Sequence, residues 1–153
     1  MSKPTEELMA SLQRLGRLFA SRQVTSRITT AAGVEVSQQG AALLRALLRE
    51  GQLSVAGLAA ATPMEIAAVS RQVRLLEQAG AVERTRSPED GRVALLELTK
   101  EGRATAEKIR SVGVHHLQDA LAGWSAADQH TLATLLARLV DDLKSTPVPP
   151  DSS

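Results

Sequence analysis

Three consecutive stretches decide the fold of this chain: AVERTR at residues 81–86, SPEDG at 87–91 and RVALLEL at 92–98. The first and third stretches contain the β-branched and alternating apolar residues typical of strands. The second combines serine, proline, aspartate and glycine, which favour turns. The sequence therefore predicts a β-hairpin, with Arg86 and Arg92 at its tip and Asp90 between them.

The residues before this hairpin predict a helix-turn-helix. Ser37 is a candidate N-cap for a helix that ends at Gly51, and residues 53–55 form a short extended piece. A short helix over residues 55–61 follows, and Pro63 separates it from a longer helix over residues 65–78 because proline breaks a helix interior. A helix-turn-helix followed directly by a hairpin is a winged helix, an arrangement typical of DNA-binding proteins.

The helix over residues 65–78 is amphipathic. Its spacing predicts a buried face of Ile66, Val69, Val73 and Leu76, flanked by Leu75. Its opposite face is polar and basic, with Ser70, Arg71 and Arg74. This polarity makes the helix a candidate recognition helix.

Long helices are predicted on both sides of the winged helix. Residues 5–30 read as one amphipathic helix, stopped by Gly33. Thr99 caps a further helix, which Gly123 and Trp124 interrupt, and Trp124 is interpreted as a packing anchor. Ser125 and Asp128 resemble a capping box at the start of the last helix. The apolar stripe of that last helix consists of Leu132, Leu135, Leu136, Leu139, Val140 and Leu143.

Composition excludes several kinds of chemistry. The chain has 153 residues and no cysteine, which rules out disulfides, zinc-thiolate sites and thiol redox sensing. Phe19 and Trp124 are the only aromatic residues, which disfavours single-stranded nucleic acid as a ligand because such binding uses stacked rings. Lys and Arg outnumber Asp and Glu by 4 over residues 1–110, whereas residues 111–153 carry a balance of −3. This division suggests that only the first part faces an anionic partner.

Two short motifs carry a family resemblance. Asp90 and Arg92 are separated by one residue at the hairpin turn, and Leu98, Thr99 and Gly102 form a Leu-Thr-x-x-Gly helix start. In this order behind a helix-turn-helix, the motifs resemble the wing of the MarR family of bacterial transcription regulators, and the order of elements agrees over residues 5–144. The turn at Thr62 and Pro63 departs from the family, which has an apolar residue and glycine there.

The resemblance implies a mainly α fold with a small β-hairpin wing (α+β), a winged helix-turn-helix with long N- and C-terminal dimerisation helices. The expected division is a dimerisation helix over residues 1–35, a DNA-binding lobe over 36–98, dimerisation helices over 99–145 and a disordered tail over 146–153. The expected function is that of a homodimeric, sequence-specific regulator of transcription, a repressor released by a small-molecule effector. Its partner would be double-stranded DNA with a pseudo-palindromic operator.

The resemblance places residues 65–78 in the major groove and the hairpin in the minor groove. Asp90 is expected to orient Arg92 through a charge-assisted bond, and Arg84 to serve the hairpin base or a phosphate. Glu65 either accepts from a cytosine amino group or only favours the helix start through the dipole. The candidate DNA-binding residues are Glu65, Ala67, Ala68, Ser70, Arg71, Arg74, Arg84, Arg86, Asp90 and Arg92.

Two further sites follow from the resemblance. An effector pocket is expected between the dimer helices and the DNA-binding lobe, and a regulator without an effector stays an open alternative. The candidate pocket residues are Leu15, Phe19, Arg22, Leu44 and His116. The candidate dimer-interface residues are Leu8, Leu12, Leu132, Leu135, Leu136, Leu139 and Leu143.

Other functions are disfavoured by the sequence. No nucleophile elbow or phosphate-binding glycine loop is present, so no enzyme activity and no cofactor are expected. His115, His116 and His130 lack metal-ligand spacing, so no metal site is expected. The chain shows no targeting signal and no apolar run of membrane-spanning length, which predicts a cytoplasmic protein with no membrane partner. The competing hypothesis is a winged-helix dimerisation or adaptor protein that acts through protein contacts without specific DNA binding.

Overall fold

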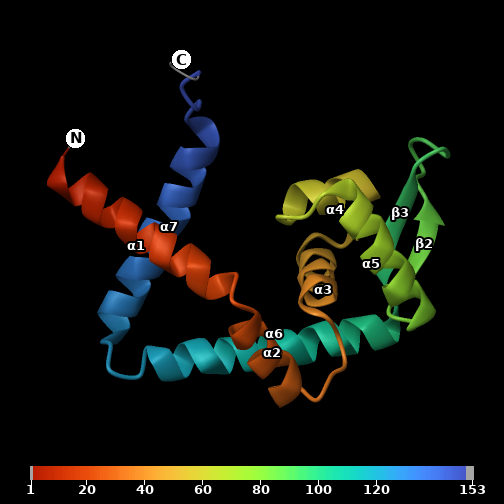
Figure 1. Cartoon of the computed structure of the whole chain (residues 1–153), viewed down its shortest axis with the longest axis horizontal. Coiled ribbons are helices and arrows are strands. Elements are labelled where there is room, and N and C mark those ends of the chain that lie inside the picture. Colours follow the sequence, from red (N-terminus) through yellow and green to blue (C-terminus); the bar gives the residue numbers. More distant parts are fainter. Residues whose placement is uncertain (1, 151–153) are drawn as a thin grey trace. The chain divides into compact units, whose positions relative to one another are not determined.

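The computed structural model describes residues 2–150, and over this range the chain forms helices and one three-stranded antiparallel sheet (Figure 1). The elements are α1 Lys3–Phe19, α2 Arg22–Ala31, α3 Gln38–Glu50, β1 Gln52–Leu53, α4 Val55–Ala61, α5 Ile66–Gln78, β2 Val82–Arg86, β3 Ala94–Leu98, α6 Lys100–Ala120 and α7 Ala126–Ser145. The chain divides into two compact units with a boundary between Val114 and His115, inside α6. The boundaries expected after residues 35, 98 and 145 divide the chain by function, whereas this boundary divides it into compact units. The functional division therefore stays a prediction.

Serine side chains begin three of the helices, because their hydroxyls accept hydrogen bonds from backbone N–H groups that have no partner inside the helix. The Oγ atoms of Ser37, Ser54 and Ser125 accept from residues 40, 57 and 128 at 3.0, 3.0 and 3.1 Å. The predicted starts at Ser37 and Ser125 are therefore confirmed. The predicted helix over residues 55–61 coincides with α4.

The core of the first unit lies where α3, α4, α5 and the sheet meet. Its largest fully buried side chains are Leu43, Leu44, Leu47, Leu58, Leu96, Ile109, Val69 and Val73. In the sheet, β3 lies between β1 and β2, and Leu96 pairs with Leu53 on one side and Arg84 on the other. The hairpin turn between β2 and β3 projects from the unit beside α5 (Figure 1).

The prediction of one helix over residues 5–30 is wrong. The chain forms two helices, α1 and α2, with Ser21 in an extended conformation between them. The buried residues of α2 are Thr25 and Thr29, whereas α1 contains no buried residue. The break changes the direction of the chain, so that α2 packs against α3. A single continuous helix is also disfavoured, because the β-branched residues of α2 have low helix propensity.

Two smaller predictions also need correction. The extended piece expected at residues 53–55 lies one residue earlier, as β1, because Ser54 already caps α4. Ile66, expected on the buried face of α5, is 57% exposed, whereas Val69, Val73 and Leu76 are buried. Ile66 is the first residue of α5 and extends past the core that covers the following turns.

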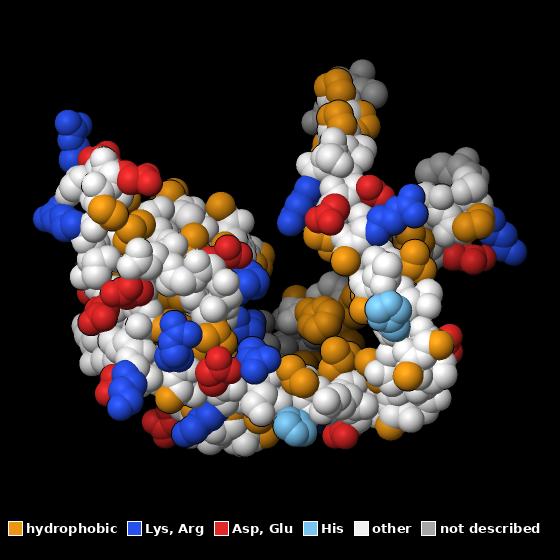
Figure 2. Space-filling model, turned by 180° about the vertical axis from the view of Figure 1, so that it is seen from behind, with side chains coloured by type: hydrophobic (Ala, Val, Ile, Leu, Met, Phe, Trp, Pro, Cys, Tyr) orange, Lys and Arg blue, Asp and Glu red, His pale blue; other side chains and the backbone are white. Residues whose placement is uncertain are grey.

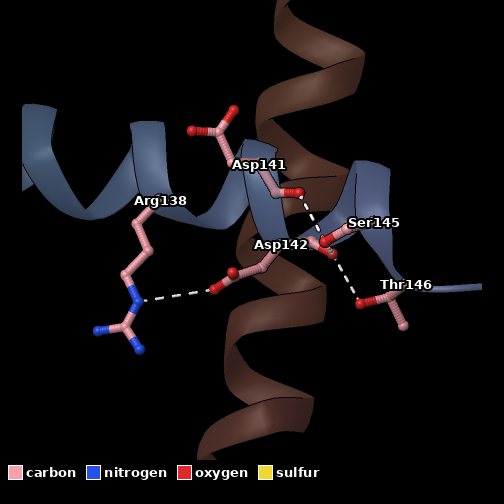
Figure 3. Close-up of polar contacts among 5 residues, drawn as sticks. All are labelled: Arg138, Asp141, Asp142, Ser145 and Thr146. Atoms are coloured by element: carbon pink, nitrogen blue, oxygen red, sulfur yellow. Dashed lines mark hydrogen bonds and ion pairs between the residues drawn. The ribbon is translucent and has the colours of Figure 1, made fainter.

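The second unit consists of the end of α6, a turn and α7. None of the residues of α7 is buried, and Trp124, interpreted as a packing anchor, is 46% exposed. Figure 3 shows how α7 ends: the hydroxyls of Ser145 and Thr146 donate to the carbonyls of Asp141 and Asp142, while Arg138 pairs with Asp142 at 3.6 Å. Of the tail expected to be disordered, residues 151–153 lie outside the described residues.

Candidate nucleic-acid interface

The exposed face of α5 carries the basic residues expected of a recognition helix. Glu65 stands at the N-cap position without a capping bond from its side chain, and Ala67 is exposed next to it. Ala68 and Ser70 are half-buried, whereas Arg71 and Arg74 are exposed. The side chains of Arg71 and Arg74 make no hydrogen bond or ion pair with other residues in the range 2–150, so they are available to an anionic ligand.

Local hydrogen bonds hold the hairpin turn in one conformation. The Ser87 hydroxyl accepts from the backbone N–H groups of Glu89 and Asp90, both at 3.3 Å. Arg86 Nη1 donates to the Gly91 carbonyl at 2.8 Å, and the Ser87 N–H donates to the Val93 carbonyl at 2.9 Å. These bonds stabilise the turn conformation that presents Arg92.

Asp90 does not orient the Arg92 guanidinium, which corrects the sequence-based expectation. Asp90 Oδ1 accepts from the backbone N–H of Arg92 at 3.0 Å. The short aspartate side chain reaches a backbone donor two residues ahead, as in many turns, and this bond competes with an ion pair. The Arg92 guanidinium has no partner among the described residues. Asp90 thus fixes the backbone of the turn and leaves Arg92 available.

Arg84 serves the base of the hairpin. Its Nε donates to Glu77 Oε1 at 2.8 Å, so the guanidinium links β2 to the last turn of α5. Of the two alternatives for Arg84, the structure favours the hairpin base over a phosphate. The pair ties the hairpin to the recognition helix, and the two elements that would contact DNA are held together at this point.

Two residues of the Leu-Thr-x-x-Gly motif join the hairpin to α6: Thr99 through its hydroxyl, and Gly102 because it has no side chain. Thr99 Oγ1 donates to the Gly80 carbonyl at 2.6 Å and accepts from the Gly102 N–H at 3.0 Å. A Cβ atom on Gly102 would lie 1.8 Å from the Ala81 carbonyl oxygen, so only glycine fits at this position. The motif therefore fixes where β2 begins relative to the start of α6.

Sequence reasoning missed one residue that positions α5. Gln72 accepts a hydrogen bond from Ser37 Oγ and donates one to Gln39 Oε1, both at 3.0 Å. These bonds attach the middle of α5 to the beginning of α3. Gln72 is separated from these partners by more than 30 residues, and no local pattern indicates the contact.

The residues expected to form an effector pocket are not brought together within the first unit. Leu44 is fully buried in the core, Phe19 is 67% exposed, and His116 belongs to the second unit. Leu44 is covered by the core of the first unit, and helical spacing alone does not say which neighbour covers a residue. The expected pocket stays a prediction. A cavity of about 600 Å³ does lie next to Arg22; its lining is Arg22, Thr25, Ser26, Thr29, Val36, Ser37, Gln38, Gln39, Ala42, Pro63 and Met64.

The described part of the chain offers neither a cluster of metal ligands nor a helix that could span a membrane. Within residues 2–150 there is no group of three or more His, Cys, Asp or Glu side chains arranged to hold a metal ion. None of the described helices is both long and apolar enough to cross a membrane.

Comparisons with known proteins agree with this geometry. The model of the MarR family matches residues 36–94. The chain is 32% identical over 110 residues to the uncharacterised HTH-type transcriptional regulator YdgJ of Bacillus subtilis (strain 168), covering 72% of this chain and 67% of YdgJ. It is 31% identical over 97 residues to a second uncharacterised HTH-type regulator of that strain, YxaD, covering 63% of this chain and 68% of YxaD.

A solved structure confirms the fold. The structure of a MarR family protein from Bacillus stearothermophilus superposes with a TM-score of 0.80 at 21% identity, covering 95% of this chain and 99% of that one. The mainly helical winged-helix fold expected from the sequence is thus correct, and the relatives are transcriptional regulators rather than enzymes. The chain belongs to the MarR family of DNA-binding transcriptional regulators.

Proposed function

We propose that this protein is a homodimeric repressor that binds a pseudo-palindromic DNA operator and is released by a small molecule. Each protomer would place α5 in a major groove and the hairpin turn in the adjacent minor groove. Two-fold symmetry then requires half-sites about one helical turn apart, on the order of 10 bp. DNA as the ligand implies a cytoplasmic location.

The observation that carries the proposal is the set of exposed arginines without a protein partner on α5 and the turn. Arg71 and Arg74 on α5 suit phosphates or guanine edges, which guanidinium groups recognise with two parallel bonds. Arg92 lies on a turn already held by Ser87 and Asp90, so its insertion into a minor groove costs little ordering. Ala67 and Ile66 are exposed at the start of α5 and suit contact with thymine methyl groups.

Homodimerisation is supported by apolar surface on α1 and α7. Neither helix contains a buried residue, although each has an apolar stripe. Figure 2 shows exposed hydrophobic side chains along the helical parts of the chain outside the winged helix. Apolar residues exposed along two helices indicate a surface that contacts another protein chain. The exposed members include Leu8, Leu15, Leu132, Leu135, Leu136 and Leu143.

An effector site is supported by the cavity beside Arg22. Its volume of about 600 Å³ lies within the range of small-molecule sites, on the order of 300–1,000 Å³. Pro63 and Met64, on its wall, immediately precede the N-cap of α5. A ligand that binds more tightly to one conformation of this turn would change the fraction of molecules in which α5 is placed to fit DNA.

The test of DNA binding is selection of bound duplexes from a random pool, followed by fluorescence anisotropy with the selected sequence. Affinity is expected to fall steeply with salt, because phosphate contacts release counterions. The R71A, R74A and R92A variants are each expected to weaken binding by about 1–3 kcal/mol. The matched control is R138A, on the exposed surface of α7, which should bind like the wild type. Failure to select any sequence, or equal losses in all four variants, would favour the adaptor hypothesis.

A further inference from the structure

A second cavity of the first unit is lined mainly by arginines. It has a volume of about 460 Å³ and lies between α3 and the first half of α6. We name it the arginine pocket; its lining residues are Arg45, Leu48, Arg49, Arg103, Glu107 and Arg110. None of these residues belongs to the proposed DNA interface or to the cavity beside Arg22.

The helical spacing explains why these residues converge. On α3 the lining residues are at positions 45, 48 and 49, and on α6 they are at positions 103, 107 and 110. Spacings of three and four residues place side chains on one face of a helix. Two such faces line the same cavity, so guanidinium groups 54 to 65 residues apart in sequence share one site.

The charge of the pocket is not neutralised by the protein. Four arginines face one carboxylate, Glu107, which pairs with Arg110 Nε at 2.9 Å. Arg49 pairs through Nε with Glu50, outside the lining, at 3.0 Å. The side chains of Arg45 and Arg103 have no hydrogen bond or ion pair with any other residue of the described chain. Counting both carboxylates, two positive charges remain unbalanced.

The charged residues of the pocket are all exposed, so water screens their repulsion, and the convergence of charge costs the protein alone only a few tenths of a kcal/mol per pair. Like charges four residues apart on a helix, such as Arg45 and Arg49, destabilise it. Desolvation, and then repulsion from Arg49, lowers the pKa of Arg45, although an arginine stays protonated at neutral pH. Leu48 supplies apolar lining, but it does not explain why four arginines surround one cavity.

We infer that the arginine pocket binds a small anion that carries at least two phosphate or carboxylate groups. The planar guanidinium fork bonds such groups with two parallel N–H donors, which lysine cannot do. A cavity of about 460 Å³ suits a small molecule rather than a peptide helix. Two anionic groups would engage Arg45 and Arg103 from opposite walls and bridge α3 to α6.

The test is isothermal titration calorimetry of the full chain with pyrophosphate and with citrate at constant ionic strength. The wild type is expected to show saturable binding, and R45Q/R103Q should weaken it at least about tenfold because two charge-assisted bonds are lost. The control R14Q/R17Q removes the same charge from the exposed surface of α1 and should bind like the wild type. Should R45Q/R103Q fail to fold by circular dichroism, R103Q alone is expected to weaken binding several-fold.

Three results would overturn the inference. The first is the absence of saturable binding of either probe to the wild type. The second is an equal loss in R45Q/R103Q and R14Q/R17Q, which would indicate diffuse electrostatic attraction. The third is a loss of operator affinity and salt dependence in R45Q/R103Q without any effect on the probes, which would assign these arginines to the DNA backbone. The titration contains no DNA, so the first two results are independent of the proposed repressor function; the third is read from the anisotropy assay with the selected operator.

Discussion

Replacing Gly102 with alanine should strongly destabilise the protein. The added Cβ would lie 1.8 Å from the Ala81 carbonyl oxygen and 2.7 Å from its carbon. Even a close C···O contact is about 3.3 Å, so α6 and the start of β2 must separate by more than an ångström. That movement breaks the bond from the Thr99 N–H to the Ala81 carbonyl, now 3.1 Å, and strains the bond from Thr99 Oγ1 to the Gly80 carbonyl.

The expected magnitude combines two effects. Overpacking costs about 1–3 kcal/mol, and each lost hydrogen bond about 0.5–1.5 kcal/mol. The free energy of unfolding of G102A should therefore fall by about 2–4 kcal/mol, which lowers the melting temperature by about 5–15 °C for a chain of this size. Urea and thermal denaturation followed by circular dichroism, at one protein concentration for all variants, measure both quantities.

Gly113 provides a control on the same helix. A Cβ at Gly113 meets nothing within 4 Å, so G113A adds helix propensity without a clash. It should leave stability unchanged or raise it by up to about 1 kcal/mol. If G102A melts within about 1 °C of the wild type while G113A behaves as expected, the close contact between α6 and β2 is not a constraint, and this account of the Leu-Thr-x-x-Gly motif is wrong.

Three further changes test other parts of the structure. D90N keeps an oxygen that can accept from the Arg92 N–H, so its DNA affinity should stay within about twofold of the wild type. D90A lacks this oxygen and should lose affinity several-fold in the same anisotropy assay. Equal losses in the two variants would indicate that Asp90 acts by orienting the Arg92 guanidinium. S54A removes the cap of α4 and should cost about 1 kcal/mol in urea denaturation, and a cost near zero would show that the cap is dispensable. L135E should shift the sedimentation coefficient from that of a dimer to that of a monomer, and an unchanged dimer would exclude this face of α7 from the interface.

Much of the fold followed from local signals. The starts at Ser37 and Ser125 and the turn at residues 87–91 rest on hydrogen bonds that span only a few residues. Gly80 adopts a φ of +75° between α5 and β2, a conformation that glycine adopts without strain. The wing motif also indicated membership of the MarR family, and the comparisons confirm that membership.

The candidate site was predicted less completely. The exposed positions of Arg71, Arg74 and Arg92 agree with the expected DNA-binding face, although their contacts with DNA stay a prediction. The partners of Arg84 and Asp90 were not predictable, because a charged side chain has several donors or acceptors within reach. Glu77 and the Arg92 backbone N–H are selected only by where the hairpin lies against α5.

By itself, the sequence determined the order of the elements from α3 onward, the caps at Ser37 and Ser125, the hairpin turn, the absence of thiol chemistry and the wing that identifies the family. These features depend on residues within a few positions of each other, where covalent connectivity already fixes the geometry. The tertiary structure alone decided the break between α1 and α2, the exposure of Ile66, the attachment of Gln72 to α3 and the arginine pocket. Each of these depends on packing between residues distant in the chain, and periodicity shows which face of a helix is apolar or charged but not which neighbour covers it.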